Sequence, residues 1–129
     1  MRMRAGNYNI TCEQGSTFRR TLEIEQPNLE ADPTGQTFEP FSLSGYTARM
    51  QVRRTIDSNN FLLELTTENG NLTINPTGTA DNQIYIDVSA SVTASVNSSG
   101  FYDIEIISAD GIVSRVLQGT FNLSPEVTR

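Results

Sequence analysis

The chain has 129 residues and a formal net charge of −6, with 15 acidic side chains against nine basic ones. This length fits one domain that can bury a hydrophobic core, and the acidic balance argues against nonspecific binding to nucleic acid or to anionic membranes. The sequence has no histidine or lysine and only one cysteine, which excludes histidine-dependent nucleophile pairs, a Ser–Lys pair and an internal disulfide.

The first seven residues include two cations, Arg2 and Arg4, but no apolar segment follows them. We therefore expect residues 1–7 to form a terminal arm and not a signal peptide. No stretch reaches the roughly 20 apolar residues that a membrane helix needs. These features predict synthesis in the cytoplasm and no membrane partner.

Two strands and a long connector are expected in the first third of the chain. Residues 7–11 suit a short edge strand, and residues 17–24 alternate apolar and polar side chains. Residues 26–40 then form a polar connector with three prolines, in which Leu29 and Phe38 are the only large apolar residues. A connection of this length without regular structure is uncommon in a small domain and is often functional or mobile.

A β-hairpin is expected from residues 46–54 and 61–66, joined by a polar turn at 57–60. Pairing Arg54 with Phe61 sets apolar side chains opposite one another, which is how register is fixed. The resulting apolar pairs are Val52 with Leu63 and Met50 with Leu65.

The Asn-Gly dipeptide at 69–70 is a further turn signal, because both residues tolerate a positive φ. A two-residue loop there would set Ile74 opposite Leu65, on the same buried face. We therefore expect a second hairpin at this position.

Residues 83–88 alternate as a strand, and residues 89–96 follow with valines four positions apart. Ser89 suits the N-cap of one short helical turn, which would bridge two sheets. At the end of the chain, Pro125 prevents a central strand from continuing, so residues 124–129 are expected to form a second terminal arm.

The strongest local signal is a hairpin from residues 101–107 and 112–121 around the Asp-Gly dipeptide at 110–111. With a two-residue loop, Ile104 falls opposite Leu117 and Tyr102 opposite Gly119, so the apolar side chains share one face. The same register sets Arg115 opposite Ile106 on the apolar side. There Arg115 would either reach water at the end of the sheet or pair with a carboxylate such as Asp87.

The sequence thus predicts one all-β domain over residues 1–129, an antiparallel two-sheet β-sandwich of the immunoglobulin-like or a related type. It has about eight strands and at most one short helical turn. Two sheets are expected because a single sheet would leave its apolar face in water.

Two groups of acidic residues suggest chemistry, and each has a simpler interpretation. Asp103 and Glu105 lie two apart on one strand face, as a carboxylate pair for glycoside chemistry or as part of a solvated sheet face. Residues 57–59 and 81–82 offer oxygen ligands for calcium, but they lack the spacing of an EF-hand loop and are ordinary turn residues. We therefore predict no enzyme activity, no metal and no cofactor.

Five segments occur in order along nearly the whole chain: 15–22, 43–53, 86–90, 100–106 and 119–129. This succession of strand and turn residues resembles the small tail-associated proteins of tailed bacteriophages. It is also similar to the N-terminal domain of phage baseplate upper proteins, which joins a receptor-binding part to the tail. The resemblance implies an immunoglobulin-like or related sandwich that acts by assembly, and it implies no active-site residues.

From this resemblance we expect a bacteriophage virion structural protein, an adaptor of the tail, baseplate or fibre-attachment region. Its partners would be other virion proteins and further copies of itself in a homo-oligomer, with no nucleic acid. A capsid-decorating protein is one alternative, and a carbohydrate-binding module for the host surface is a second, although the chain has no tryptophan and only four tyrosines for stacking on sugars.

The expected contact elements are the strand edges, the connector and both termini. In the terminal arms, Arg2, Arg4 and Arg129 are candidates for docking on acidic neighbours. Phe38 and Phe41 are candidates for anchors at an interface, and core packing is the alternative for both.

Overall fold

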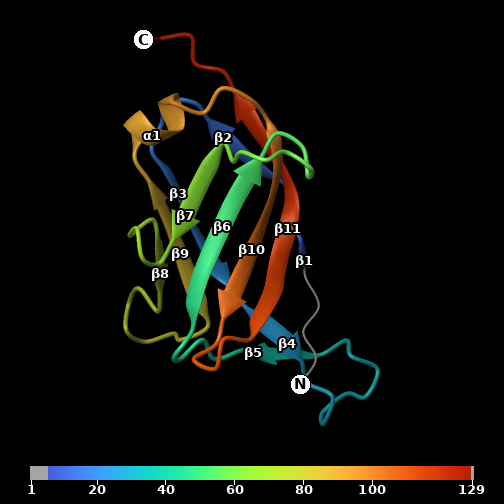
Figure 1. Ribbon diagram of the computed structural model, residues 1–129. Coiled ribbons are helices and arrows are strands. Elements are labelled where there is room, and N and C mark those ends of the chain that lie inside the picture. The colour runs from blue at the N-terminus through green and yellow to red at the C-terminus, as the bar shows by residue number, and fades with distance from the viewer. Residues whose placement is uncertain (1–5, 129) are drawn as a thin grey trace.

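The computed structural model describes residues 6–128, and nearly all of its regular structure is β (Figure 1). The predicted all-β sandwich is confirmed. In the described part of the chain there are eleven strands and one helix: β1 Gly6–Asn7, β2 Ile10–Glu13, β3 Phe18–Glu23, β4 Glu25–Pro27, β5 Phe38–Pro40, β6 Thr47–Arg53, β7 Leu63–Thr66, β8 Leu72–Ile74, β9 Gln83–Val88, α1 Ala90–Ala94, β10 Gly100–Ile107 and β11 Val113–Ser124.

The larger sheet has the strand order β1-β11-β10-β6-β7, and β2 also pairs with β11. The smaller sheet has the order β3-β9-β8 and lies behind the larger one in Figure 1. β4 and β5 form a separate two-stranded ribbon at one end. Two mainly antiparallel sheets, with the last two strands in a hairpin beside a central strand of the larger sheet, give the layout of immunoglobulin-like sandwiches.

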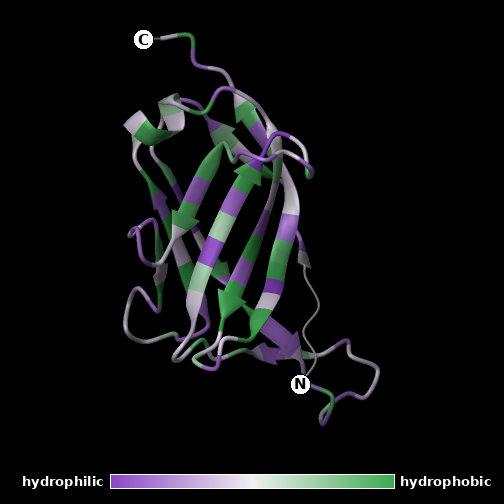
Figure 2. Cartoon of the chain, viewed as in Figure 1, coloured by the Kyte–Doolittle hydropathy of each residue, from purple (hydrophilic) through white to green (hydrophobic). Residues whose placement is uncertain are grey.

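The core lies between the two sheets and is built by the alternation of side chains along each strand. Figure 2 shows this alternation as bands of opposite hydropathy along β6 and β10. Fully burying one aliphatic side chain contributes about 1.5–3 kcal/mol. The largest fully buried side chains are Phe121, Ile10, Leu43, Met50, Leu65, Leu72, Ile84, Ile86, Ile104, Ile106, Val52 and Val88.

The β6–β7 hairpin has the predicted register, with Val52 opposite Leu63 and Met50 opposite Leu65. The prediction of a hairpin around residues 69–70 is wrong. The chain turns there, but β8 pairs with β9 in the other sheet, so Ile74 lies opposite Ile84. The apolar pattern of β8 suits either sheet, and the local turn signal does not distinguish them.

The β10–β11 hairpin keeps the predicted pairs Ile104–Leu117 and Tyr102–Gly119, but its turn differs from the prediction. Of the two residues Asp110 and Gly111, only Gly111 has a positive φ, 84°. The Ser108 N–H donates to the Ile112 carbonyl oxygen at 2.9 Å. This geometry makes a three-residue loop, one residue longer than expected.

A β-bulge compensates for the longer turn, so that the pairs from Ile104 back to Gly100 keep the predicted register. The predicted position of Arg115 on the apolar side is wrong. The register shifts between Ile104 and Glu105, which leaves Val116 as the extra residue and sets Glu105 opposite Arg115. Val116 is therefore buried, whereas Arg115 is exposed on the outer face of the sheet. A bulge re-aims side chains in this way because two residues of one strand oppose one residue of the other.

The short helical turn is confirmed as α1, which links β9 in the smaller sheet to β10 in the larger one. Ser89 is its N-cap, and the Ser89 hydroxyl oxygen accepts a hydrogen bond from the Val92 N–H. Thr93 is fully buried; its hydroxyl donates to the Ser16 carbonyl oxygen at 2.8 Å and accepts from the Gly15 N–H at 3.1 Å. These bonds tie α1 to the β2–β3 turn.

The first strand runs parallel to β11 in two pieces, β1 and β2, with Tyr8 and Asn9 between them. The buried Tyr102 hydroxyl donates to the Tyr8 carbonyl oxygen at 2.5 Å, and burial raises the pKa of Tyr102 well above its usual range. A Cβ atom at Gly119 would lie 2.2 Å from the same carbonyl oxygen. The close approach of the Tyr8 backbone to β11 therefore requires glycine at position 119.

The structure revises the expected arms and connector. The arm expected at 1–7 ends in β1, and the arm expected at 124–129 begins with the last residue of β11. The connector at 26–40 contains the β4–β5 ribbon, since Gln26 pairs with Glu39. No helix in residues 6–128 is long and apolar enough to cross a membrane.

We predict that Gly119→Ala destabilises the fold by about 1–3 kcal/mol, the usual cost of forcing extra volume into a packed site. Chemical denaturation measures the change. Gly6→Ala is the matched control on the same strand pair, because a Cβ there would lie 3.4 Å from its nearest atom. Equal stability of the two variants would contradict the close approach of the Tyr8 carbonyl group to Gly119.

Candidate functional site

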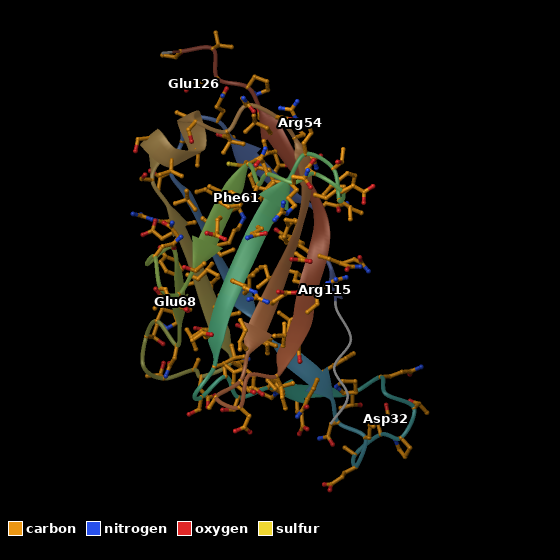
Figure 3. All side chains as sticks on the ribbon, viewed as in Figure 1. Asp32, Arg54, Phe61, Glu68, Arg115 and Glu126 are labelled. Atoms are coloured by element: carbon orange, nitrogen blue, oxygen red, sulfur yellow. The ribbon has the colours of Figure 1, made fainter. Side chains whose placement is uncertain are left out.

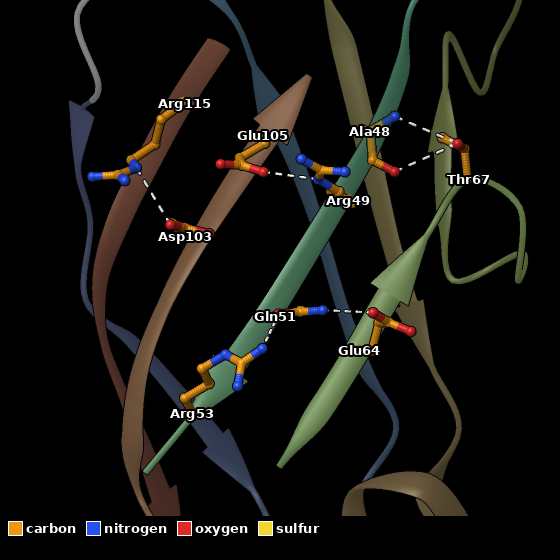
Figure 4. Close-up of polar contacts among 9 residues, drawn as sticks. All are labelled: Ala48, Arg49, Gln51, Arg53, Glu64, Thr67, Asp103, Glu105 and Arg115. Carbon is orange, nitrogen blue, oxygen red and sulfur yellow. Dashed lines mark hydrogen bonds and ion pairs between the residues drawn. The ribbon is translucent and has the colours of Figure 1, made fainter. Parts of the chain in front are cut away.

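The outer face of the larger sheet carries three groups of paired polar side chains from four strands (Figure 4). Arg49 Nε lies 2.8 Å from Glu105 Oε1, and Arg115 Nε lies 3.3 Å from Asp103 Oδ2. These cross-strand pairs exist because the odd-numbered residues of β6 and β10 point away from the core. The predicted pairing of Arg115 with Asp87 is wrong, because Arg115 pairs with Asp103. Asp87 pairs instead with Arg19 on the smaller sheet.

Gln51 is the middle residue of the third group, between Glu64 and Arg53. The Gln51 Nε2 group donates to Glu64 Oε2 at 2.6 Å, and Arg53 Nη2 donates to Gln51 Oε1 at 2.8 Å. Arg53 Nη1 also donates to the Ser58 carbonyl oxygen at 2.7 Å. Among residues 6–128, Arg53 forms no ion pair with a carboxylate.

A hollow of ≈ 590 Å³ lies on this face, above β1, β6, β10 and β11. The volume is within the range of small-molecule sites. We call it the outer-face hollow. It is lined by Asn7, Asn9, Gln51, Arg53, Ile56, Phe101, Tyr102, Asp103, Glu105, Arg115, Gln118, Gly119 and Thr120.

The carboxylates Asp103 and Glu105 line the outer-face hollow. Burial is the main cause that raises the pKa of Asp103, and the nearby Glu105 charge raises it further, whereas Arg115 opposes the shift. Each carboxylate is held by an arginine of a neighbouring strand. Both carboxylates are thus engaged in cross-strand ion pairs on the outer face of the sheet.

The residues considered for calcium are dispersed. Asp57 lies in the loop after β6, and Asp81 Oδ2 accepts a hydrogen bond from the Ser42 hydroxyl at 2.7 Å. Within residues 6–128 no three His, Cys, Asp or Glu side chains come together as a group that could hold a metal ion.

The free edge of β7 is covered by the chain's own Asn69. The Thr67 N–H donates to the Ala48 carbonyl oxygen on β6, so the backbone groups of Glu64 and Thr66 point away from the sheet. Asn69 Oδ1 accepts from the Thr66 N–H at 3.0 Å, and Asn69 Nδ2 donates to the Glu64 carbonyl oxygen at 3.1 Å. The side chain thus replaces a neighbouring strand and blunts this edge against pairing.

The β4–β5 ribbon projects beyond the end of the sandwich, with Asp32 at its tip (Figure 3). Asp32 Oδ1 accepts from the Thr34 N–H at 3.0 Å and from the Thr34 hydroxyl at 2.6 Å, and Asp32 Oδ2 accepts from the Thr37 hydroxyl at 3.2 Å. These hydrogen bonds lower the pKa of Asp32. They also order a loop that sequence reasoning treated as structureless.

The two phenylalanines considered as interface anchors differ in exposure, since Phe38 lies at the surface and Phe41 is buried. Phe38 on the ribbon is 56% exposed, and Leu29 nearby in sequence is 58% exposed. Phe41 is buried in the core and makes an edge-on contact with Tyr46, the ring centroids being 5.7 Å apart. Phe41 is therefore a core residue, and only Phe38 is available at the surface.

The terminal arginines Arg2, Arg4 and Arg129 lie outside the described residues. The last described segment is attached to the body, since the Glu126 N–H donates to Gln14 Oε1 at 2.9 Å. Gln14 Nε2 donates to the Val96 carbonyl oxygen at 2.9 Å, so one side chain joins this segment to the end of α1.

No protein-family model matches the chain, and no curated protein matches it. Among solved structures, extracellular domains 3–5 of Drosophila OTK resemble it at 11% identity, with a TM-score of 0.35. That alignment covers 89% of this chain and 32% of the other, so the chain spans about a third of the length of that structure. A likeness this weak carries no argument about function.

We predict that Asp103 titrates above pH 3.8 and Asp32 below it, in line with the directions of their pKa shifts. Because the folded pKa of Asp103 is raised, its protonation on acidification favours the folded state, whereas protonation of Asp32 disfavours it. Carboxyl ¹³C NMR as a function of pH measures both values. The opposite order of the two pKa values would contradict the geometry described.

We also predict that Asn69→Ala destabilises the chain by about 0.5–1.5 kcal/mol, because two backbone groups lose their partner. The exposed β7 edge should also promote self-association at high concentration. Chemical denaturation and sedimentation velocity measure the two effects. Asn60→Ala, at an exposed loop position, is the control and should change neither; the same response from both variants would refute the capping role of Asn69.

Proposed function

We propose that this chain is a structural protein of a bacteriophage virion, an adaptor of the tail, baseplate or fibre-attachment region that acts by protein–protein assembly. The proposal starts from the resemblance of its strand and turn segments to tail-associated proteins. The sandwich supplies a rigid body, and its surface features supply the contacts.

The observation that carries the proposal is the β4–β5 ribbon. It extends beyond one end of the sandwich, away from the α1 end (Figure 1), and presents Phe38 on an ordered backbone. An aromatic side chain held on a rigid projection is suited to anchor an interface, because few rotamers are lost on binding.

The charge of the ribbon indicates the kind of surface it would meet. Residues 25–40 contain Glu25, Glu30, Asp32 and Glu39 but no arginine. Such a segment favours a partner surface with basic groups around an apolar pocket, since complementary charge speeds association and fixes orientation. The neighbouring virion protein would bind Phe38 in that pocket.

Cryo-electron microscopy of the intact particle that encodes this chain tests the proposal. We predict density for the sandwich in the tail, with the β4–β5 ribbon against a neighbouring protein. Density on the head surface would instead indicate the alternative, a capsid-decorating protein. Density on the head, or none on the particle, would overturn the tail assignment.

A substitution tests the role of the ribbon directly. Phe38→Ser should lower incorporation into particles at least tenfold, the effect of losing about 1.4 kcal/mol of binding free energy, as measured by quantitative mass spectrometry of purified virions. Phe61→Ser is the matched control, because Phe61 is similarly exposed, at 48%, and lies on the β6–β7 connection. Equal incorporation of both variants would exclude Phe38 as the anchor.

A further inference from the structure

We propose that the outer-face hollow is a binding site for an uncharged saccharide. This inference goes beyond the assembly function and does not depend on it. It rests on the chemistry of the lining, on groups with unused hydrogen-bonding capacity, and on two exposed apolar side chains that line the hollow.

The lining combines hydrogen-bond donors and acceptors in the mixture that a sugar hydroxyl requires. A hydroxyl group both donates and accepts, so it is matched best by amides and carboxylates side by side. Four carboxamides line the hollow together with two carboxylates and two guanidinium groups. These side chains come from β1, β6, β10, β11 and the adjoining loops, so a ligand in the hollow would contact several strands at once.

Several of these groups are held in place and still have capacity for a ligand. Asp103 Oδ2 is fixed by Arg115, while Asp103 Oδ1 has no hydrogen-bond partner among residues 6–128. Asn9 Oδ1 accepts from the Thr120 N–H at 3.1 Å, which leaves its amide nitrogen available as a donor. Polar groups fixed by their neighbours bind with a smaller entropic cost than mobile ones.

The lining of the hollow also includes two exposed apolar side chains beside the polar ones. Phe101 is 44% exposed, and Ile56 is 79% exposed. Both line the hollow, next to Arg53. An exposed aromatic ring beside orienting hydrogen-bond groups suits a pyranose, which has an apolar C–H face and a belt of hydroxyls.

The charges of the lining favour an uncharged ligand. Asp103 is paired with Arg115 and Glu105 with Arg49, while Arg53 donates to the Gln51 side chain and to the Ser58 carbonyl oxygen. An acidic saccharide would face those carboxylates on a chain whose net charge is −6. A protein partner is a poorer match, because the core of a protein interface is depleted of charged residues.

The test begins with the purified chain on a printed array of neutral and acidic oligosaccharides. The neutral oligosaccharide with the strongest signal is then titrated into ¹⁵N-labelled protein, and the affinity is measured from chemical shifts. We expect the largest shifts at residues 101–105 and 118–120. We expect Phe101→Ala and Asp103→Ala each to weaken binding at least tenfold.

Two matched controls distinguish the hollow from the rest of the surface. Phe61→Ala removes an aromatic ring of similar exposure that does not line the hollow. Asp87→Ala breaks an arginine–aspartate pair on the opposite sheet, with an Arg19 Nε–Asp87 Oδ1 distance of 3.1 Å. Both variants should bind the oligosaccharide as the unchanged chain does.

Three outcomes would overturn the proposal. One is the absence of binding to any neutral oligosaccharide, and another is binding confined to acidic oligosaccharides. The third is binding that the hollow variants and the control variants weaken equally.

Discussion

The apolar layer between the two sheets is the constraint on which every other feature of this molecule depends. Ile104 and Met50 from the larger sheet and Ile86 from the smaller one are all fully buried in it. Because side chains alternate along a strand, burying one face of β6 and β10 forces their other face into water. The polar pairs of the outer face and the outer-face hollow are thus consequences of the way the core is packed.

Much of the fold could be predicted from the sequence because local signals and burial agree over β6, β7 and β10. The register of Met50 with Leu65 follows from the apolar pattern alone. The bulge at Val116 could not be predicted, since it depends on the longer turn at Gly111 and on which of two adjacent residues the core accepts. Which sheet receives β8 is decided by long-range packing that the Asn-Gly turn does not encode.

The candidate site was predictable only in part. Alternation along one strand places Asp103 and Glu105 on a common outer face, and the arginines opposite them complete the ion pairs. The outer-face hollow could not be foreseen, because its wall includes Asn7 and Thr120, which are brought together by the parallel pairing of the first strand with β11. Antiparallel turn signals give no indication of that pairing.

We propose that the rigid sandwich acts through its projecting β4–β5 ribbon. Amide hydrogen–deuterium exchange, compared between the free chain and the chain within intact particles, tests this claim most directly. In the free chain, β6 and β10 should exchange slowest, because they lie in the interior of the larger sheet. In the particle, residues 25–40 should gain the largest protection. If residues 25–40 exchange equally fast in both states, the ribbon is not the contact element and the account is contradicted.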